Sequence, residues 1–232
     1  MKIYANASTD FDPQLDLIPH YCRYPEMRVW VGRNFASTKT RLLVVAESHY
    51  MPDTCTVHHD PIAWYSGVEI PAGARDWMCT RGIIQNGINI RWNTKSKTIY
   101  RNIEAAIAAS GIFPDGPRSV FSEIAFFNFF QRPAEVLGGS IRVSQADHEM
   151  ACMVFKDVVG TIKPTAVAFT STLASNHAKA GGLKDFLEVN GIAHVTTPHP
   201  SSAWWNRPSR PYGDRTGRQS LVDFLTATVQ TA

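Results

Sequence analysis

Clustered cysteines are missing from the sequence. Its four cysteines, Cys22, Cys55, Cys79 and Cys152, are widely scattered and form no Cys-x-x-Cys pair. This spacing argues against a zinc ribbon, a clustered metal site and an iron–sulfur centre, because each of these needs thiolates held close together. We expect reduced thiols rather than disulfides.

Long apolar runs and a strong excess of one charge are missing as well. No segment reaches the ~20 residues needed to cross a bilayer, and the start of the chain lacks the apolar stretch of a signal peptide. We therefore expect a soluble, cytoplasmic and monomeric protein with no membrane partner. The formal net charge is +3, which permits a nucleic-acid partner without requiring one.

The chain also lacks a recognisable linker, an internal repeat and a low-complexity tract. Its 232 residues suffice for one large α/β domain, so we predict a single domain over residues 1–232. Hydrophobic residues make up 44% of the chain and charged residues 19%, a balance that allows a sizeable buried core.

Strand patterns alternate with helical patterns along the chain. Apolar and β-branched runs predict buried strands over residues 41–46, 120–130, 165–170 and 193–199. Helical spacing and capping signals predict helices over residues 95–110, 144–160, 171–179 and 183–189, and a last helix that includes Leu221, Phe224, Leu225 and Val229. This alternation predicts an α/β fold with a mainly parallel sheet.

Two regions show no sustained periodicity. Residues 1–27 mix Asp, Pro and aromatic side chains, and we expect coil and short helices there. Residues 51–92 are rich in Gly, Pro and aromatic residues, and a segment of this length with so weak a pattern is typically functional or mobile.

Polar side chains follow three of the predicted strands. Residues 47–50, Glu-Ser-His-Tyr, come directly after the first strand, and Asn128 lies in the second. The last strand leads into residues 199–205, His-Pro-Ser-Ser-Ala-Trp-Trp, and its prolines cannot continue a sheet ladder. Ligands bind at the carboxyl ends of strands in open parallel sheets, so the first and last of these segments are candidate sites of chemistry. The amide of Asn128, inside an aromatic run, must be satisfied either by neighbouring backbone or by a ligand.

The order of these segments resembles the uracil-DNA glycosylase superfamily. In that superfamily the first strand ends in a Gly-Gln-Asp-Pro-Tyr or Gly-Glu-x-Pro-Gly loop, and the last strand ends in His-Pro-Ser. The resemblance covers residues 41–205, and only the final motif is identical. It implies a three-layer α/β/α fold with a mainly parallel four-stranded sheet, a single- or double-stranded DNA partner with uracil or a modified base, and no metal or other cofactor.

The resemblance also implies roles for the residues of the site. Glu47, together with Ser48, would hold or activate the attacking water, and Tyr50 would wall off one side of the base. Asn128 would read the edge of the base through its amide. His199 would stabilise the negative charge that develops on the departing base, as glycosidic cleavage of an extruded nucleotide requires.

The segment after His-Pro would contact the DNA itself. By resemblance, Ser201 or Ser202 would touch a flanking phosphate. Some members insert a leucine wedge into the vacated base stack, and this position is Ala203 here, which is too small. Trp204 or Trp205 is adjacent, and an aromatic wedge is physically adequate.

Other positions depart from the pattern of the superfamily. Ser48 stands where the best-known branch has the water-activating Asp, so Glu47 would have to replace that base. His49 stands where the loop has Pro. The aromatic residue that stacks on the base cannot be located by spacing, and Trp64, Tyr65 and Trp77 are candidates.

Two other classes of function remain open from the sequence. The altered first loop and the small residue at the wedge position favour a glycosylase-like domain that only binds nucleic acid or nucleotides. A metal-dependent hydrolase could instead use the imidazoles and carboxylates of Glu47, His49, His58, His59 and Asp60. The arginines of residues 207–218 are interpreted as a solvated surface or as contacts to a phosphate backbone.

Overall fold

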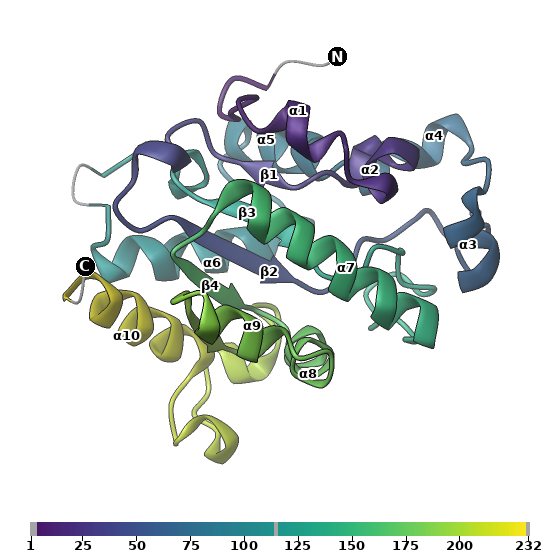
Figure 1. Ribbon diagram of the computed structural model, residues 1–232. Coiled ribbons are helices and arrows are strands. Elements are labelled where there is room, and N and C mark those ends of the chain that lie inside the picture. The colour runs from purple at the N-terminus through teal and green to yellow at the C-terminus, as the bar shows by residue number, and fades with distance from the viewer. Residues whose placement is uncertain (1–3, 114–115, 231–232) are drawn as a thin grey trace.

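A five-stranded sheet runs through the centre of the protein (Figure 1). The structure is a computed structural model that describes residues 4–113 and 116–230. The strand order is β1 (Trp30–Val31), β3 (Ala125–Asn128), β2 (Leu42–Ala46), β4 (Ala166–Phe169) and β5 (Ala193–Thr196). β2 to β5 are mutually parallel, and β1 pairs antiparallel with β3 at the edge. The predicted α/β class is confirmed, with a mixed sheet and one short strand more than expected.

β2 is the central strand because its side chains are apolar on both faces. Leu43 and Val45 point into one hydrophobic cluster, while Leu42, Val44 and Ala46 point into the other. Full burial of a Val or Leu side chain contributes roughly 1.5–3 kcal/mol relative to exposure. A strand of this composition is therefore stable only between two helical layers.

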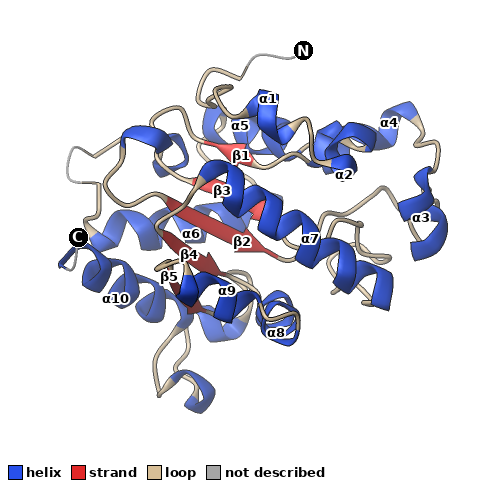
Figure 2. Cartoon of the chain, in the orientation of Figure 1, coloured by secondary structure: helices blue, strands red, loops and turns tan. Residues whose placement is uncertain are grey.

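Helices cover both faces of the sheet, as Figure 2 shows. The cluster on one face includes residues of α1 (Asp12–Leu15), α2 (Pro19–Arg23), α3 (Pro61–Gly67), α4 (Ala72–Arg75), α7 (Gln145–Ile162), α8 (Thr172–Ala180) and α9 (Leu183–Val189). The cluster on the other face includes residues of α5 (Thr80–Asn89), α6 (Thr98–Ser110) and α10 (Gly217–Gln230). Short 3₁₀ turns lie at η1 (Pro25–Met27), η2 (Phe35–Ser37), η3 (Asp76–Met78), η4 (Lys95–Lys97), η5 (Val120–Ser122), η6 (Ala203–Trp205) and η7 (Arg210–Tyr212).

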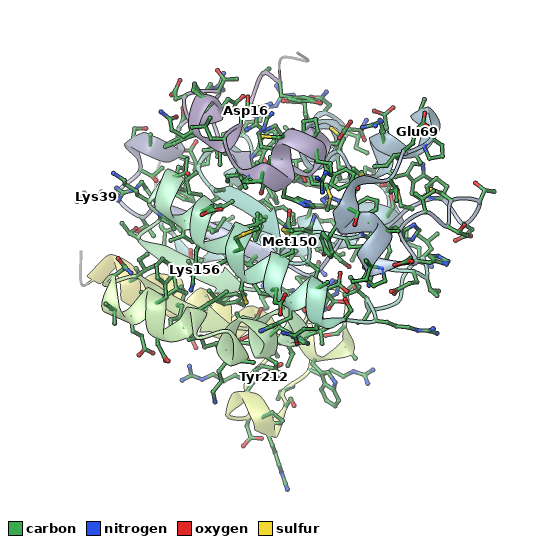
Figure 3. The ribbon with its side chains drawn as sticks, turned by 45° about the vertical axis from the view of Figure 1, so that its right-hand side comes forward. Asp16, Lys39, Glu69, Met150, Lys156 and Tyr212 are labelled. Atoms are coloured by element: carbon green, nitrogen blue, oxygen red, sulfur yellow. The ribbon has the colours of Figure 1, made fainter. Side chains whose placement is uncertain are left out.

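Two helix-end signals in the sequence are confirmed. Ser144 and Asp147 form a reciprocal capping box at the start of α7, the helix on which Figure 3 labels Met150 and Lys156. α6 ends at Gly111, which adopts a left-handed conformation with φ of 71°. No helix within residues 4–113 and 116–230 is long and apolar enough to span a bilayer.

Several predicted boundaries were wrong. The segment 120–130 is not one strand, because η5 precedes β3. β5 ends at Thr196 rather than His199, and it lies at the edge of the sheet with its residues exposed or half-buried, not buried. Short helices do occupy the described part of residues 1–27, whereas residues 1–3 lie outside the described ranges.

The segment 51–92 contains regular structure that its weak pattern hid. It holds α3, α4 and α5. α5 includes two glycines, which are poor helix formers, and Gly87 has a packing reason. A Cβ atom at Gly87 would lie 1.8 Å from Cζ3 of Trp92, so the indole packs directly on the backbone of the helix.

Candidate active site

A cavity of about 460 Å³ lies at the carboxyl ends of β2 and β3 and beside the loop after β5. Its volume is in the range of small-molecule sites. Seven of the residues singled out in the sequence line it together: Glu47, Ser48, His49, Tyr50, Trp77, Asn128 and His199. The parallel register explains this, because Ala46 pairs with Asn128 and both strands end at the same edge.

Aromatic rings form much of the cavity wall. Tyr100 from α6 and Phe126 from β3 line it with ring centroids 5.2 Å apart, and Trp77 and Tyr50 contribute further surface. Tyr100 is itself stacked on Trp92, at 5.3 Å between centroids. The cavity therefore offers flat apolar faces against which a planar ring can stack.

Of the three stacking candidates, only Trp77 lines this cavity. Trp64 is fully buried elsewhere, stacked on Tyr24, and its indole donates to the carbonyl oxygen of Gln131. Tyr65 donates its hydroxyl to Asp147. Trp64 is thus part of the core, and half-buried Tyr65 packs against it. No local pattern in the sequence distinguishes these two residues from Trp77.

Asn128, His49 and Thr80 form a buried polar cluster at the cavity. The Nδ2 atom of Asn128 lies 2.9 Å from Nε2 of His49, and Oγ1 of Thr80 lies 3.1 Å from the same nitrogen. Burial lowers the pKa of His49 to about 3. The imidazole is therefore neutral at physiological pH, and its Nε2 accepts the amide hydrogen bond from Asn128.

Glu47 is held by a serine from the neighbouring strand. Ser171, two residues after the end of β4, donates its hydroxyl to Oε2 of Glu47 at 2.7 Å, and its oxygen accepts from the backbone N–H of Ala174 to cap α8. Oε1 of Glu47 has no hydrogen-bond partner among the described residues. This oxygen is available to polarise a water molecule in the cavity.

His199 has a defined tautomer. Its Nδ1 accepts a hydrogen bond from the backbone N–H of Ser201 at 3.3 Å and lies 2.8 Å from Oγ of the same serine. Burial lowers the pKa of His199, and the charge of Glu47 opposes this shift only in part. Because Nδ1 accepts in the neutral ring, the proton is on Nε2, and this N–H is free to donate to a ligand.

The loop that carries His199 is anchored by two helices. Asn102 of α6 donates its amide to the carbonyl oxygen of Pro200 at 2.7 Å. Pro198 packs on Gly217 at the start of α10, where an added Cβ atom would lie 2.5 Å from Cγ of the proline. These contacts fix the loop on either side of the imidazole.

A second hollow of about 480 Å³ adjoins the cavity and shares residues with it, among them Glu47, Tyr50 and His199. It adds Lys95 from η4 and Ser201. Lys95 is the cation of this hollow and Glu47 is its carboxylate, so the hollow has no excess of positive charge for a phosphate group.

The predicted DNA-contacting residues differ in their accessibility. Ser201 is exposed and lines the second hollow, whereas Oγ of Ser202 is buried and has no partner among the described residues. Trp204 is 51% exposed, and Trp205 is buried in the core. The next segment, η7, projects from the body in Figure 1, and the hydroxyl of Tyr212, labelled in Figure 3, lies 2.6 Å from Oγ1 of Thr172.

Of the five candidate metal ligands, only Glu47 and His49 line the same cavity. His58 is buried and contacts the carbonyl oxygen of Ala134 through Nε2, while Asp60 caps α3 through the backbone of Ile62 and Ala63. Within the described parts of the chain, no group of three or more His, Cys, Asp or Glu residues is arranged to hold a metal ion.

Three residues that line the cavity or contact its lining residues were not predicted from the sequence. Ser171 follows β4 as Glu47 follows β2, so the rule applied to the other strand ends would have found it. Thr80 and Tyr100 lie on helices, and only the folded chain brings them to the cavity.

Comparisons with known proteins provide no further identification. No model of a known protein family matches the chain, and no curated protein is significantly similar to it. Function must therefore be inferred from the chemistry of the cavity.

Proposed function

We propose that the protein is a DNA glycosylase of the uracil-DNA glycosylase type, which hydrolyses the N-glycosidic bond of uracil or a related modified base. The observation that carries this proposal is the convergence of Glu47, Asn128 and His199 on one aromatic-walled cavity. They arise from three different strand ends, in the chain order of the superfamily motifs. The four parallel strands, with β1 as an added edge, are compatible with the four-stranded sheet of that superfamily.

In the proposed reaction the target nucleotide leaves the base stack and its base enters the cavity. The base stacks against the aromatic wall, and Asn128 forms hydrogen bonds with its edge. Glu47 Oε1 orients a water molecule toward C1′ of the sugar. As the bond from C1′ to the base nitrogen breaks, its electron pair stays with the base, and the water hydroxyl bonds to C1′. The water proton passes to Glu47 and then to the departing base.

His199 stabilises the leaving group in this scheme. Its Nε2–H donates to the base oxygen on which negative charge develops, while Ser201 holds Nδ1. A neutral imidazole suits this role because it donates a hydrogen bond to the base oxygen without transferring its proton. Groups of this kind are typically worth about 10²-fold to 10³-fold in rate.

The test is base release from uracil-containing single- and double-stranded oligonucleotides in the presence of a chelator. We expect His199→Ala to lower the rate by about 10²-fold to 10³-fold and Glu47→Ala to lower it by about 10²-fold to 10⁴-fold. The matched control is His194→Ala, since His194 lies on the preceding strand, outside the cavity, beside Glu188. Full activity of the His199→Ala protein would refute the site.

A second candidate is a glycosylase-like module that binds nucleic acid without chemistry. The observation that favours it is Ser48, a hydroxyl at the position where the superfamily has its water-activating Asp. In the same assay this candidate predicts oligonucleotide binding with no released base, whereas loss of activity on chelation would revive the metal-dependent hydrolase.

A further inference from the structure

An arm of residues 206–216 leaves the body of the protein directly after the loop that carries His199 (Figure 1). It connects η6 to α10, and its two ends lie together, because an added Cβ atom at Gly217 would be 3.0 Å from Cε3 of Trp205. The same glycine packs on the His199 loop. The base of the arm is therefore fixed beside that loop. The arm itself lies outside residues 41–205, which carry the resemblance to the superfamily.

The arm has a defined conformation without a core of its own. Ser209 and Arg215 form an isolated antiparallel bridge, and the turn between them includes Gly213, whose φ of 65° is left-handed. Tyr212 connects this turn to the body, since its hydroxyl lies 2.6 Å from Oγ1 of Thr172 at the start of α8. All residues of the arm are exposed or half-buried, so burial of apolar surface does not explain its presence.

The arm and the first turn of α10 carry the excess positive charge of the protein. Residues 206–218 contain four arginines and one aspartate, a formal charge of +3. The whole chain also has a net charge of +3, so the remaining residues are neutral overall. The excess charge is concentrated on one projection instead of being spread over the surface, a pattern that is typical of nucleic-acid-binding proteins.

Most of these arginines are available to a partner. Arg207, Arg210 and Arg218 are exposed and form no ion pair within the described residues, whereas Arg215 pairs with Asp223 at 2.9 Å. A guanidinium group stays charged at physiological pH, and its N–H donors match the geometry of phosphate oxygens. Several such groups on one arm fit a ligand with repeated phosphates.

We propose that residues 206–218 bind the phosphate backbone of a polynucleotide outside the cavity. While one nucleotide occupies the cavity, the arm holds the strand beyond it, and Arg207 and Arg210 neutralise backbone phosphates. This inference deepens the proposed function and rests on it for the ligand in the cavity. Because these arginines act through binding alone, they change the affinity for a polynucleotide and not the rate of bond cleavage in the bound complex.

The first test measures the binding of fluorescent single- and double-stranded oligonucleotides by anisotropy at a series of salt concentrations. Each neutralised phosphate contributes about 0.9 to the slope of log K against log salt for a duplex and about 0.7 for a single strand. We expect Arg207→Gln/Arg210→Gln to weaken binding and to reduce this slope by about 1.8 for the duplex or about 1.4 for the single strand. This measurement needs no catalytic activity.

The matched control is Arg33→Gln/Lys39→Gln, which removes the same charge from two other exposed side chains. Arg33 follows β1, whose last residue pairs with the first residue of β3, and Lys39 precedes β2, so both lie at the end of the sheet opposite the cavity. We expect this variant to leave the slope unchanged. An unchanged slope in the arm variant, or an equal reduction in both variants, would overturn the inference.

A second test, base release, separates the inference from the proposed function. If the unaltered protein releases the base, Arg207→Gln/Arg210→Gln should raise the oligonucleotide concentration that gives half the maximal rate and leave the saturated single-turnover rate unchanged. If that concentration did not change, the inference would fail while the function stood. If the unaltered protein released no base, the proposed function would fail, and the salt slopes alone would support or overturn the inference.

Discussion

Two buried polar clusters of this protein differ in how completely their hydrogen bonds are satisfied. At the end of β3, Arg132 has no exposed surface and uses all five N–H donors: two with Asp147, one with Glu135, and two with the carbonyl oxygens of His58 and Arg142. At the cavity, Glu47, His49, Asn128 and His199 each keep one polar atom without a partner among the described residues.

This difference separates a structural role from a ligand-binding role. Burial alone would raise the pKa of Asp147, but hydrogen bonds from Arg132 and Ser144 lower it, so the ion pair remains charged and closed to solvent. The cavity residues are held on one side only, with the other side open. Similar residue types thus stabilise the loop after β3 in one place and can bind a ligand in the other.

Removal of the guanidinium should have the largest effect on the fold. Arg132→Met would leave the carboxylate of Asp147 buried and unpaired, and we expect a loss of about 3–5 kcal/mol in the free energy of unfolding. Urea denaturation measures this value. The control is Arg215→Met, which removes an exposed pair with Asp223 and should change stability by less than about 1 kcal/mol. Equal losses in the two variants would contradict the assigned role of Arg132.

Acidification should act through the buried histidines, of which His49 lies at the cavity and His20 lies in the core. Burial lowers the pKa of His49 and of His20 to about 3, and Arg23 adds to the shift at His20. In the unfolded chain a histidine has a pKa of about 6.5. Between these values the unfolded state binds more protons, so stability is complete above about pH 6.5 and falls by about 1.4 kcal/mol per pH unit for each histidine as the pH decreases.

Unfolding curves at pH 7, 6 and 5 would measure this slope. We expect His20→Gln to reduce this slope by the contribution of one histidine. The control His194→Gln, on β5 and outside both sites, should leave the slope unchanged. A slope that stayed the same in His20→Gln would show that this ring is protonated in the folded protein, contrary to its burial.

The smallest effect on stability is expected at Trp204. This side chain is 51% exposed, so Trp204→Ala should change the free energy of unfolding by less than about 0.5 kcal/mol. If it serves as the wedge, the same variant should weaken oligonucleotide binding about tenfold, since one base–aromatic contact is worth roughly 1–3 kcal/mol. Fluorescence anisotropy would measure the binding, and an unchanged affinity would exclude the wedge.

The sequence predicted those parts of the fold that local chemistry determines. β2 was recognisable because both of its faces are apolar, and the start of α7 because Ser144 and Asp147 form a capping box. α5 was missed because Gly87 is a poor helix former locally and is favoured only by the approach of Trp92.

The residues of the site were predicted to a similar extent. The residues that were not predicted were missed for a related reason. Glu47, Asn128 and His199 follow strand ends, a position that the sequence marks. The contacts of Thr80 and Ser171 span 31 and 124 residues along the chain, so no local pattern contains them. Likewise, Trp64 and Trp77 look alike in the sequence, and only packing places one in the core and the other at the cavity.

The helices α6 and α10 anchor the loop that carries His199. Protein engineering could therefore alter the site indirectly, through substitutions between these two helices. Asn102 and Gly217 contact the loop but are not among the residues that line the cavity. Substitutions where the two helices meet would reposition the imidazole by fractions of an ångström while leaving every cavity-lining side chain intact. A library directed at that interface would tune the site from outside it.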